Sequence, residues 1–499
     1  MKDATEMNPN KIVQYLGKPA GEFTKEDLIK YMVDNKIEMV NFRHVGGDGR
    51  LKTLNFVITS KAQLNELLSA GERVDGSSLF SYIDAASSDL YVIPRYKTAY
   101  MNPFAAIPTV DILCSYYTNE GLRLPSSPEN VLRKAHEALH NSTGLTLEAM
   151  GELEYYVFHD RQHLYPTAAQ RGYQESSPFS KWEGLRCEAM QAIAQAGGKI
   201  KYGHTEVGNI REEDQEMEQH EIEFLSVPIE DAADQLVIAK WILRMIGYKY
   251  GVTVSLAPKI LAGHAGSGLH IHTRLVKDGE NMMIEGNSLS DLARKAIAGY
   301  LSLASSLTAF GNTVPTSYLR LVPHQEAPTN VCWGDRNRSV LVRVPLGWLN
   351  VEDMARDANL QDKGEALEFM DKQTVEFRCP DGSANIHLLL AGLAVAARYG
   401  LEMEGALELA SKLYVDVDIS SPEHRRIQER LPQLPASCWE SAENLLKDRE
   451  IYQRDGVFSA TVVDGIVAKL KGYDDKDLSE RLYGKEDKIR ELVNEYLHC

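Results

Sequence analysis

The sequence lacks the patterns that would place it in several common classes of protein. Its six cysteines are scattered without CxxC spacing, which argues against a disulfide framework or a zinc ribbon and favours buried thiols. No GxxxxGK(S/T) run and no strand-anchored GxGxxG occurs, so neither a P-loop nor a dinucleotide-binding turn is indicated. Positive charge is also scarce, since 54 Lys and Arg stand against 71 Asp and Glu, for a net charge of −17. This balance argues against nucleic acid as a partner.

Long apolar runs are missing as well. The longest, from Leu388 to Ala397, is too short to cross a bilayer. The N-terminal segment MKDATEMNPNKIVQYLG has no continuous apolar stretch of the kind found in secretory signals. We therefore expect a cytoplasmic protein with no membrane partner. With 499 residues, of which 43% are hydrophobic and 25% charged, the chain is long enough for two or more domains with ordinary cores.

The order of predicted elements indicates an α+β fold in two domains. A small domain over residues 1–118 begins with an amphipathic helix and two strands joined by the turn signal GGDG. A larger domain over residues 119–499 alternates strands with long helices at irregular separations, which favours a mainly antiparallel, curved sheet with flanking helices over a regular βαβ series. Helices are expected at Asp231 to Tyr250, at Leu289 to Phe310, at Asn385 to Glu404, and in a peripheral helical region from Lys412 onward.

Polar residues two positions apart mark three predicted strands of the larger domain. The pairs are Glu152 and Glu154, His270 and His272, and Glu376 and Arg378. Because side chains alternate across a strand, the members of each pair share one face, and the three strands could direct them into one cavity. Crowded carboxylates with an occasional imidazole suit Mg²⁺ or Mn²⁺. For the glutamate pair alone, a solvated acidic edge strand is about equally compatible with the sequence.

Further acidic and basic residues strengthen the metal interpretation. Glu206 and Glu221 occur in HTEVG and QHEIEF, and four arginines, which include Arg336, cluster between SYLR and LVRVP. Planar guanidinium groups bind phosphate and carboxylate anions in two-point fashion. Divalent cations combined with arginines are the usual equipment for phosphoryl transfer. The residues alone therefore indicate a nucleotide-using ligase or kinase.

Taken in order, these motifs resemble the glutamine synthetase family in its type I-like form. The resemblance extends over nearly the whole chain, through VDGSSLF, GELEYYVF, HTEVG, QHEIEF, GSGLHIH, SYLRLVPHQEAP, NRSVLVRVP and EFRCPDGSAN. It implies an N-terminal β-grasp-like domain, a catalytic α+β domain, and a homo-oligomeric ring with active sites between subunits. It also implies ATP as a substrate and two or more Mg²⁺ or Mn²⁺ ions in each active site.

The resemblance also implies a role for each matching residue. The metal ligands would be Glu152, His270 and Glu376 for one ion, and Glu154, Glu206 and Glu221 for the other. The nucleotide phosphates would contact His272, Arg338 and Arg343, and the amino-acid substrate would contact Arg320, Arg378 and Gly266. The catalytic residues would be Arg338, Asp75 from an adjacent subunit, which binds ammonium and takes its proton, and Glu326, which closes a flap over the intermediate.

The implied reaction is the ATP-dependent ligation of glutamate and ammonium to glutamine through γ-glutamyl phosphate. The sequence departs from the family at Ala265, where Asn is common, at Thr316, and in the flap motif PHQEAP. The segment between Glu206 and Glu221 is longer than in the family, so Glu212, Glu213 or Glu216 could compete for the metal. The alternatives are a ligase of the same family that uses a polyamine or another amine, and a catalytically silent structural relative.

Overall fold

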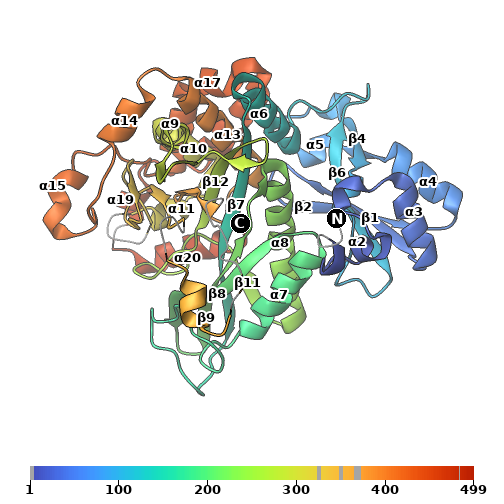
Figure 1. The fold of residues 1–499 in the computed structure, drawn as a ribbon, viewed down its shortest axis with the longest axis horizontal. Helices are drawn as coiled ribbons and strands as arrows, with labels where there is room; N and C mark the ends of the chain where they lie inside the picture. Colours follow the sequence, from blue (N-terminus) through green and yellow to red (C-terminus); the bar gives the residue numbers. More distant parts are fainter. Residues whose placement is uncertain (1–4, 323–326, 348–351, 363, 365–371, 483) are drawn as a thin grey trace.

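The structure is a computed structural model that describes residues 5–322, 327–347, 352–362, 364, 372–482 and 484–499. Its two domains lie side by side in Figure 1, the N-terminal one in blue and the larger one in the remaining colours. As the sequence predicts, an N-terminal β-grasp domain is followed by a mixed α+β domain with a mainly antiparallel sheet.

The N-terminal domain is a six-stranded sheet in the order β2-β1-β6-β4-β3, with β5 paired to β6. The strand β6 lies between β1, which runs parallel to it, and β4, which runs antiparallel. Its central position explains why VDILCSYY is an almost continuous apolar run. The elements are α2 (Lys11–Leu16), α3 (Lys25–Asp34), β1 (Met39–Val45), β2 (Leu51–Val57), α4 (Lys61–Ala70), β3 (Glu72–Asp75), α5 (Gly76–Leu79), β4 (Asp89–Pro94), β5 (Tyr100–Met101) and β6 (Thr109–Tyr117).

The larger domain is built on a ten-stranded sheet in the order β16-β17-β18-β12-β7-β9-β8. The central strand β7 is 15 residues long and pairs antiparallel with β9 on one side and β12 on the other. The other strands β10 and β11 pair with β7, and β13 pairs with β12. The strands of this sheet are β7 (Thr146–Asp160), β8 (Ile200–Arg211), β9 (Gln215–Phe224), β10 (Val227–Pro228), β11 (Thr253–Ser255), β12 (Leu269–Lys277), β13 (Glu280–Asn281), β16 (Trp333–Asp335), β17 (Val342–Val344) and β18 (Val375–Phe377). A separate two-stranded sheet is formed by β14 (Ile284–Glu285) and β15 (Ser288–Leu289).

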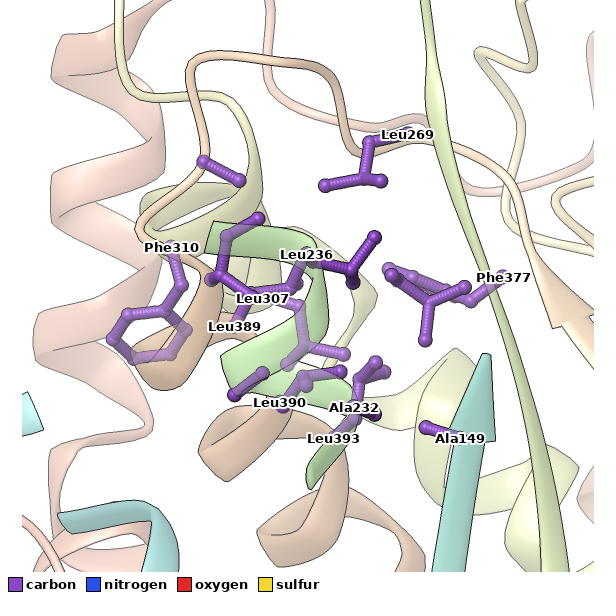
Figure 2. Close-up of a cluster of buried hydrophobic side chains, with 14 of the residues drawn as sticks. Ala149, Ala232, Leu236, Leu269, Leu307, Phe310, Phe377, Leu389, Leu390 and Leu393 are labelled. Atoms are coloured by element: carbon purple, nitrogen blue, oxygen red, sulfur yellow. The ribbon is translucent and has the colours of Figure 1, made fainter. Parts of the chain in front are cut away.

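Helices cover one face of this sheet and form the main core with it. Figure 2 shows leucines of α8, α10 and α13 packed against Phe377 of β18 and Ala149 of β7. The helices of the domain are α6 (Pro128–Thr143), α7 (Glu183–Gln195), α8 (Ile229–Tyr250), α9 (Asp291–Ser302), α10 (Ala304–Gly311), α11 (Ser317–Arg320), α12 (Met354–Ala358), α13 (Ile386–Glu402), α14 (Ala406–Lys412), α15 (Arg425–Gln428), α16 (Cys438–Lys447), α17 (Arg449–Gln453), α18 (Ala460–Gly472), α19 (Leu478–Leu482) and α20 (Glu486–Glu495).

Two details of the helical prediction differ from the structure. The helix expected from Leu289 to Phe310 is two helices that break at Leu303, where Ser306 donates a side-chain hydrogen bond to the Leu303 carbonyl. The C-terminal region is also less peripheral than expected, because α16 and α18 pack on each other and Leu445 and Val463 belong to the main core.

Ion pairs join the two domains. Arg95, just after β4, makes a two-point contact with Asp234 of α8, with distances of 2.7 Å and 2.8 Å. Burial opposes the charge on Asp234, but Arg95 and His387 hold the pKa of this carboxyl well below its usual range. A second pair, Lys97 with Asp231, lies one helical turn away at 2.6 Å. The contact therefore anchors the N-terminal domain to the helix that covers the sheet of the larger domain.

No single helix among the described residues is long and apolar enough to span a bilayer; only α13 and α14 together, bent by 108°, have a suitable length and composition.

Candidate metal and anion site

The polar pairs on β7, β12 and β18 meet because these strands are neighbours in the sheet. His270 stands opposite Glu152 in the register of β12 with β7, and His272 stands opposite Glu376 in the register of β12 with β18. Arg343 of β17 stands opposite Glu376 from the other side. Opposed side chains on neighbouring strands lie about 5 Å apart, so the register alone brings these groups into contact.

These side chains line one cavity of about 1280 Å³. Most of the residues predicted from the sequence line it directly: Glu152, Glu154, Glu206, Glu221, Gly266, His270, His272, Arg320, Arg338, Arg343 and Arg378. Glu376 adjoins the same group through its contacts with His270 and the two arginines of β17 and β18. The alternative of a solvated acidic edge strand is therefore wrong, because β7 is central in the sheet and Glu154 is 8% exposed.

The structure brings together the first predicted ligand set as one group. Oxygen and nitrogen atoms of Glu152, His270 and Glu376 lie within 4.8 Å of one another. The His270 Nδ1 atom is 2.9 Å from Glu152 and 3.5 Å from Glu376. Carboxylate oxygens with one imidazole nitrogen are a donor set that fits Mg²⁺ or Mn²⁺. The ligand role of these three residues stays a prediction that this geometry is compatible with.

The three residues of the second predicted ligand set do not form one group; they belong to two groups that share Glu221. Glu154 and Glu221 form a group with His270, while Glu206 and Glu221 form a group with His204. The competing acidic residues lie elsewhere, since Glu212 pairs with Arg490 and Glu216 with Arg211. The long segment between Glu206 and Glu221 is a hairpin extension of β8 and β9. Of the described acidic residues in this segment, Glu221 is therefore the one that the fold directs into the cavity.

Several buried carboxylates lie close together in the site, and their charges repel one another. Burial, followed by the charges of Glu152 and Glu154, raises the pKa of the Glu221 carboxyl well above its usual range. Burial also opposes ionisation of Glu152, but the imidazoles of His272 and His270 hold its pKa well below that range. A divalent cation would relieve the repulsion between these carboxylates, so the residues present fit a metal ion.

Arginines form a further part of the cavity wall. Arg343 and Arg378 both contact Glu376, at 2.8 Å and 3.1 Å, and this carboxylate holds them side by side. Arg320 is 4% exposed and donates to the Cys379 carbonyl at 2.7 Å. Arg338 is exposed on the cavity wall, and its carbonyl accepts a hydrogen bond from Arg378. The wall thus presents oriented guanidinium groups to an anionic ligand.

Glycines are required where the turn before β12 passes the arginine wall. A Cβ atom at Gly268 would lie 2.6 Å from Arg320 Nη2, and one at Gly266 would lie 2.6 Å from the Pro258 carbonyl. Both distances are shorter than a side chain tolerates, so the sequence GSG lets the backbone approach Arg320 closely. The Gly268 amide donates to Glu154, which ties the turn to the acidic side of the site.

Sequence reasoning missed several residues of the cavity. His204 contacts Glu221 at 3.2 Å, and the half-exposed rings of Tyr173 and Tyr202 pack on it at centroid distances of 5.3 Å and 5.8 Å. Glu223, which forms a group with Glu152 and His272, was also missed. The signal for Glu223 was present, because it lies two residues after Glu221 on the same strand and so shares its face.

Three predicted features lie outside the cavity or outside the description. Asp75 ends β3 and caps α5 in the N-terminal domain, where hydrogen bonds from Ser78 and Ser77 lower its pKa. It is not among the residues that line the cavity, and its place in a neighbouring subunit's site stays a prediction. Glu326 and the rest of PHQE lie outside the described residues. Ala265 is buried beside the glycine turn, where Gln170 accepts a hydrogen bond from its amide at 2.8 Å.

Comparison with known proteins agrees with this architecture. Residues 125–483 match the family described as glutamine synthetase, catalytic domain, and residues 36–119 match glutamine synthetase, beta-Grasp domain. The two-domain fold and the site define an ATP-dependent ligase. More particularly, the chain belongs to the glutamine synthetase family.

Individual relatives show the same extent of similarity. The chain is 28% identical over 483 residues to a glutamine synthetase of Mycolicibacterium smegmatis, covering 89% of this chain and 94% of that protein. It is 29% identical over 469 residues to a glutamine synthetase of Thermus thermophilus, covering 91% and 96%. Among solved structures, Plasmodium falciparum glutamine synthetase has a TM-score of 0.75 at 20% identity, covering 93% of this chain and 100% of that chain. A structure of GmaS without ligand has a TM-score of 0.73 at 17% identity, covering 92% and 99%.

Proposed function

We propose that this protein ligates glutamate and ammonium to glutamine, with ATP hydrolysed to ADP and phosphate through a γ-glutamyl phosphate intermediate. One observation carries the proposal: acidic residues, histidines and arginines line one cavity in a member of an ATP-dependent ligase family. Bound divalent cations would neutralise phosphate charge, and they would be held by Glu152, His270 and Glu376 and by Glu154, Glu206 and Glu221.

The arginine wall supplies the positions for the two anionic substrates. Arg320 and Arg378 would hold the α-carboxylate of glutamate, since Arg320 lies directly against the glycine turn. Arg338 and Arg343 would hold the nucleotide phosphates and the group in transfer. The γ-carboxylate then attacks the ATP γ-phosphorus, the bond to the ADP oxygen breaks, and the acyl phosphate forms. Each preorganised guanidinium contributes about 2.7–4 kcal/mol when it contacts the transition state, by analogy with single donors elsewhere.

The second step replaces phosphate by nitrogen. Asp75 of a neighbouring subunit would bind ammonium and take one proton from it. The ammonia formed attacks the acyl carbon, the bond to the phosphate oxygen breaks, and the second proton lost by the nitrogen leaves with the phosphate. Water must be excluded during this step because it would hydrolyse the acyl phosphate; Glu326 would contribute to this exclusion. A homo-oligomeric ring and a cytoplasmic location belong to the same proposal, and mass photometry of the purified protein tests the ring.

A second candidate is ligation of an organic amine in place of ammonium. The half-exposed rings of Tyr173 and Tyr202 flank His204 on the cavity wall, next to the carboxylate of Glu206. Aromatic faces beside a carboxylate attract organic ammonium groups. Ala265, which stands where the family commonly has an asparagine, also changes the surroundings of the glycine turn.

The deciding experiment measures phosphate release from ATP and glutamate with ammonium, methylamine, ethanolamine, putrescine or spermidine. The proposal expects ammonium to give the highest kcat/KM, and hydroxylamine to trap the acyl phosphate as γ-glutamyl hydroxamate. Turnover only with a larger amine would replace glutamine synthesis by the second candidate. Absence of phosphate release and of hydroxamate with every amine would favour a silent relative.

A further inference from the structure

We propose that Glu223 is an additional metal ligand, which forms a third cation position together with Glu152 and His272. The inference rests on the proposed function only for the identity of the cation, Mg²⁺ or Mn²⁺. It does not depend on which nitrogen donor the enzyme uses.

The strand register places Glu223 in an unfavourable position unless a cation is near. Glu223 of β9 stands directly opposite Glu152 of β7. Their side chains are 2% and 14% exposed, so little water screens the two charges. Like charges directly opposite in a sheet are destabilising, and burial strengthens the repulsion. The pair therefore needs a positive charge beside it.

The hydrogen bonding of Glu223 is also incomplete. Lys201 contacts its Oε1 atom at 2.5 Å and the Tyr202 side chain also hydrogen-bonds to this carboxylate, while its buried Oε2 atom has no hydrogen-bond partner among the described residues. Glu218, buried on the same strand, shows the contrast: it accepts hydrogen bonds from the Ser180 hydroxyl and the Lys181 amide, both at 2.8 Å, and contacts His220. A buried carboxylate oxygen without a partner costs free energy. Glu223 thus keeps a donor oxygen available in the interior.

The geometry around the Glu223 carboxylate suits a small cation. One ligand atom each from Glu152, Glu223 and His272 lie within 4.8 Å of one another. Opposite ligands of an octahedral Mg²⁺ ion are about 4.2 Å apart, twice its usual bond length, so small side-chain adjustments suffice. His272 is oriented by Thr374, whose hydroxyl lies 3.0 Å from Nδ1, and this leaves Nε2 directed toward Glu152 at 2.8 Å.

Lys201 acts in this arrangement as the substitute for the cation. Its side chain is 35% exposed and lines the same cavity, so it can leave Glu223 without a large rearrangement. Lys201 and a metal ion therefore compete for one carboxylate. Removing the carboxylate should therefore weaken metal binding, whereas removing the lysine charge should strengthen it.

The test counts Mn²⁺ ions bound to the purified, substrate-free protein by electron paramagnetic resonance of free Mn²⁺. Glu223→Gln keeps the shape of the side chain and should bind one fewer Mn²⁺ per chain, or bind it at least about tenfold more weakly. Lys201→Met should bind the same ion more tightly than the wild type, because the competing charge is gone. Glu212→Gln, which alters an acid on the same hairpin outside the cavity, should match the wild type.

Two results would overturn the inference. The first is equal Mn²⁺ stoichiometry and affinity in the wild type and in folded Glu223→Gln. The second is unchanged or weaker Mn²⁺ binding in Lys201→Met, which decides the question even if Glu223→Gln does not fold. Metal binding as expected without phosphate release for any amine would refute the proposed function and leave this inference standing. The reverse pattern would refute only the inference.

Discussion

The sharpest test of the site is Glu152→Gln, because it separates function from stability. Glu152 contacts His270 at 2.9 Å and His272 at 2.8 Å, and it belongs to two of the possible metal groups. Glutamine keeps the volume but lacks the charge that a hard cation needs. We expect kcat to fall by about 10²–10³ or more, corresponding to roughly 2.7–4 kcal/mol of transition-state stabilisation.

The stability of the metal-free variant should behave differently. The change weakens two charge-assisted hydrogen bonds of about 1.5–3 kcal/mol each. It also removes one of the buried charges that raise the pKa of Glu221, and it relieves the repulsion with Glu223. These effects oppose each other, so the melting temperature of the metal-free protein should stay close to that of the wild type. Glu218→Gln, at a buried glutamate with complete hydrogen bonding outside the cavity, should lower it clearly.

The assay is a thermal melt with and without Mn²⁺, run beside phosphate release. Saturating the native state at a hundred times the dissociation constant stabilises a protein by about 2.7 kcal/mol for one site. Wild type should therefore melt several degrees higher with Mn²⁺, while Glu152→Gln should gain much less. An equal Mn²⁺-dependent rise in both proteins, or retained turnover in the variant, would show that Glu152 is not a ligand.

Three further expectations follow from single contacts. Tyr173→Ala should weaken the apparent affinity for putrescine by roughly 0.5–2 kcal/mol while changing that for ammonium little; equal changes in the two KM values would remove the ring from amine recognition. Gly268→Ala should abolish turnover because its Cβ would lie 2.6 Å from Arg320. The control Gly184→Ala, with no atom within 4 Å of the new Cβ, should be active and about 0.4–1 kcal/mol more stable. An active Gly268→Ala enzyme would contradict the close approach of the backbone to Arg320. Arg95 lowers the pKa of Asp234, so the ionised carboxylate stabilises the fold above the unfolded pKa near 4 and less as the pH falls below it. In urea denaturation between pH 5 and 3, the free energy of unfolding should therefore fall less for Asp234→Asn than for the wild type. An equal fall in both proteins would argue against a stabilising Arg95–Asp234 pair.

Local rules were enough to predict the strands that carry the site. Polar residues two apart on GELEYY and GSGLHIH share a strand face whatever the rest of the fold does. The sequence alone therefore predicts that Glu152 lies beside Glu154, and His270 beside His272, on one face of their strands. The pairing of these strands could not be assigned in the same way. It depends on the register of segments more than a hundred residues apart, such as His270 opposite Glu152, and only the folded sheet supplies that register.

The misses have equally physical causes. The helix breaks at Leu303, and the Ser306 hydroxyl just after the break lies 2.9 Å from the hydroxyl of Tyr452 in the C-terminal region. The hydrophobic periodicity predicts one continuous helix there, because it contains no information on contacts with residues far away in the sequence. The same distant packing places Leu445 and Val463 in the core, although the charged composition around them indicates a peripheral region.

The two buried glutamates of β9 that point to different roles show how a functional carboxylate differs from a structural one. Glu218 is surrounded by donors, and its pKa is lowered to about 2 because His220 and backbone amides outweigh the effect of burial. Glu221 is surrounded by carboxylates, and its pKa rises for that reason in addition to burial. A fold selected for stability alone would pair or replace such a residue, because an uncompensated buried charge is destabilising. The strand register sets Glu152 opposite Glu223 and Glu154 opposite Glu221. This crowding of buried carboxylates is the strongest physical argument that the cavity binds cations.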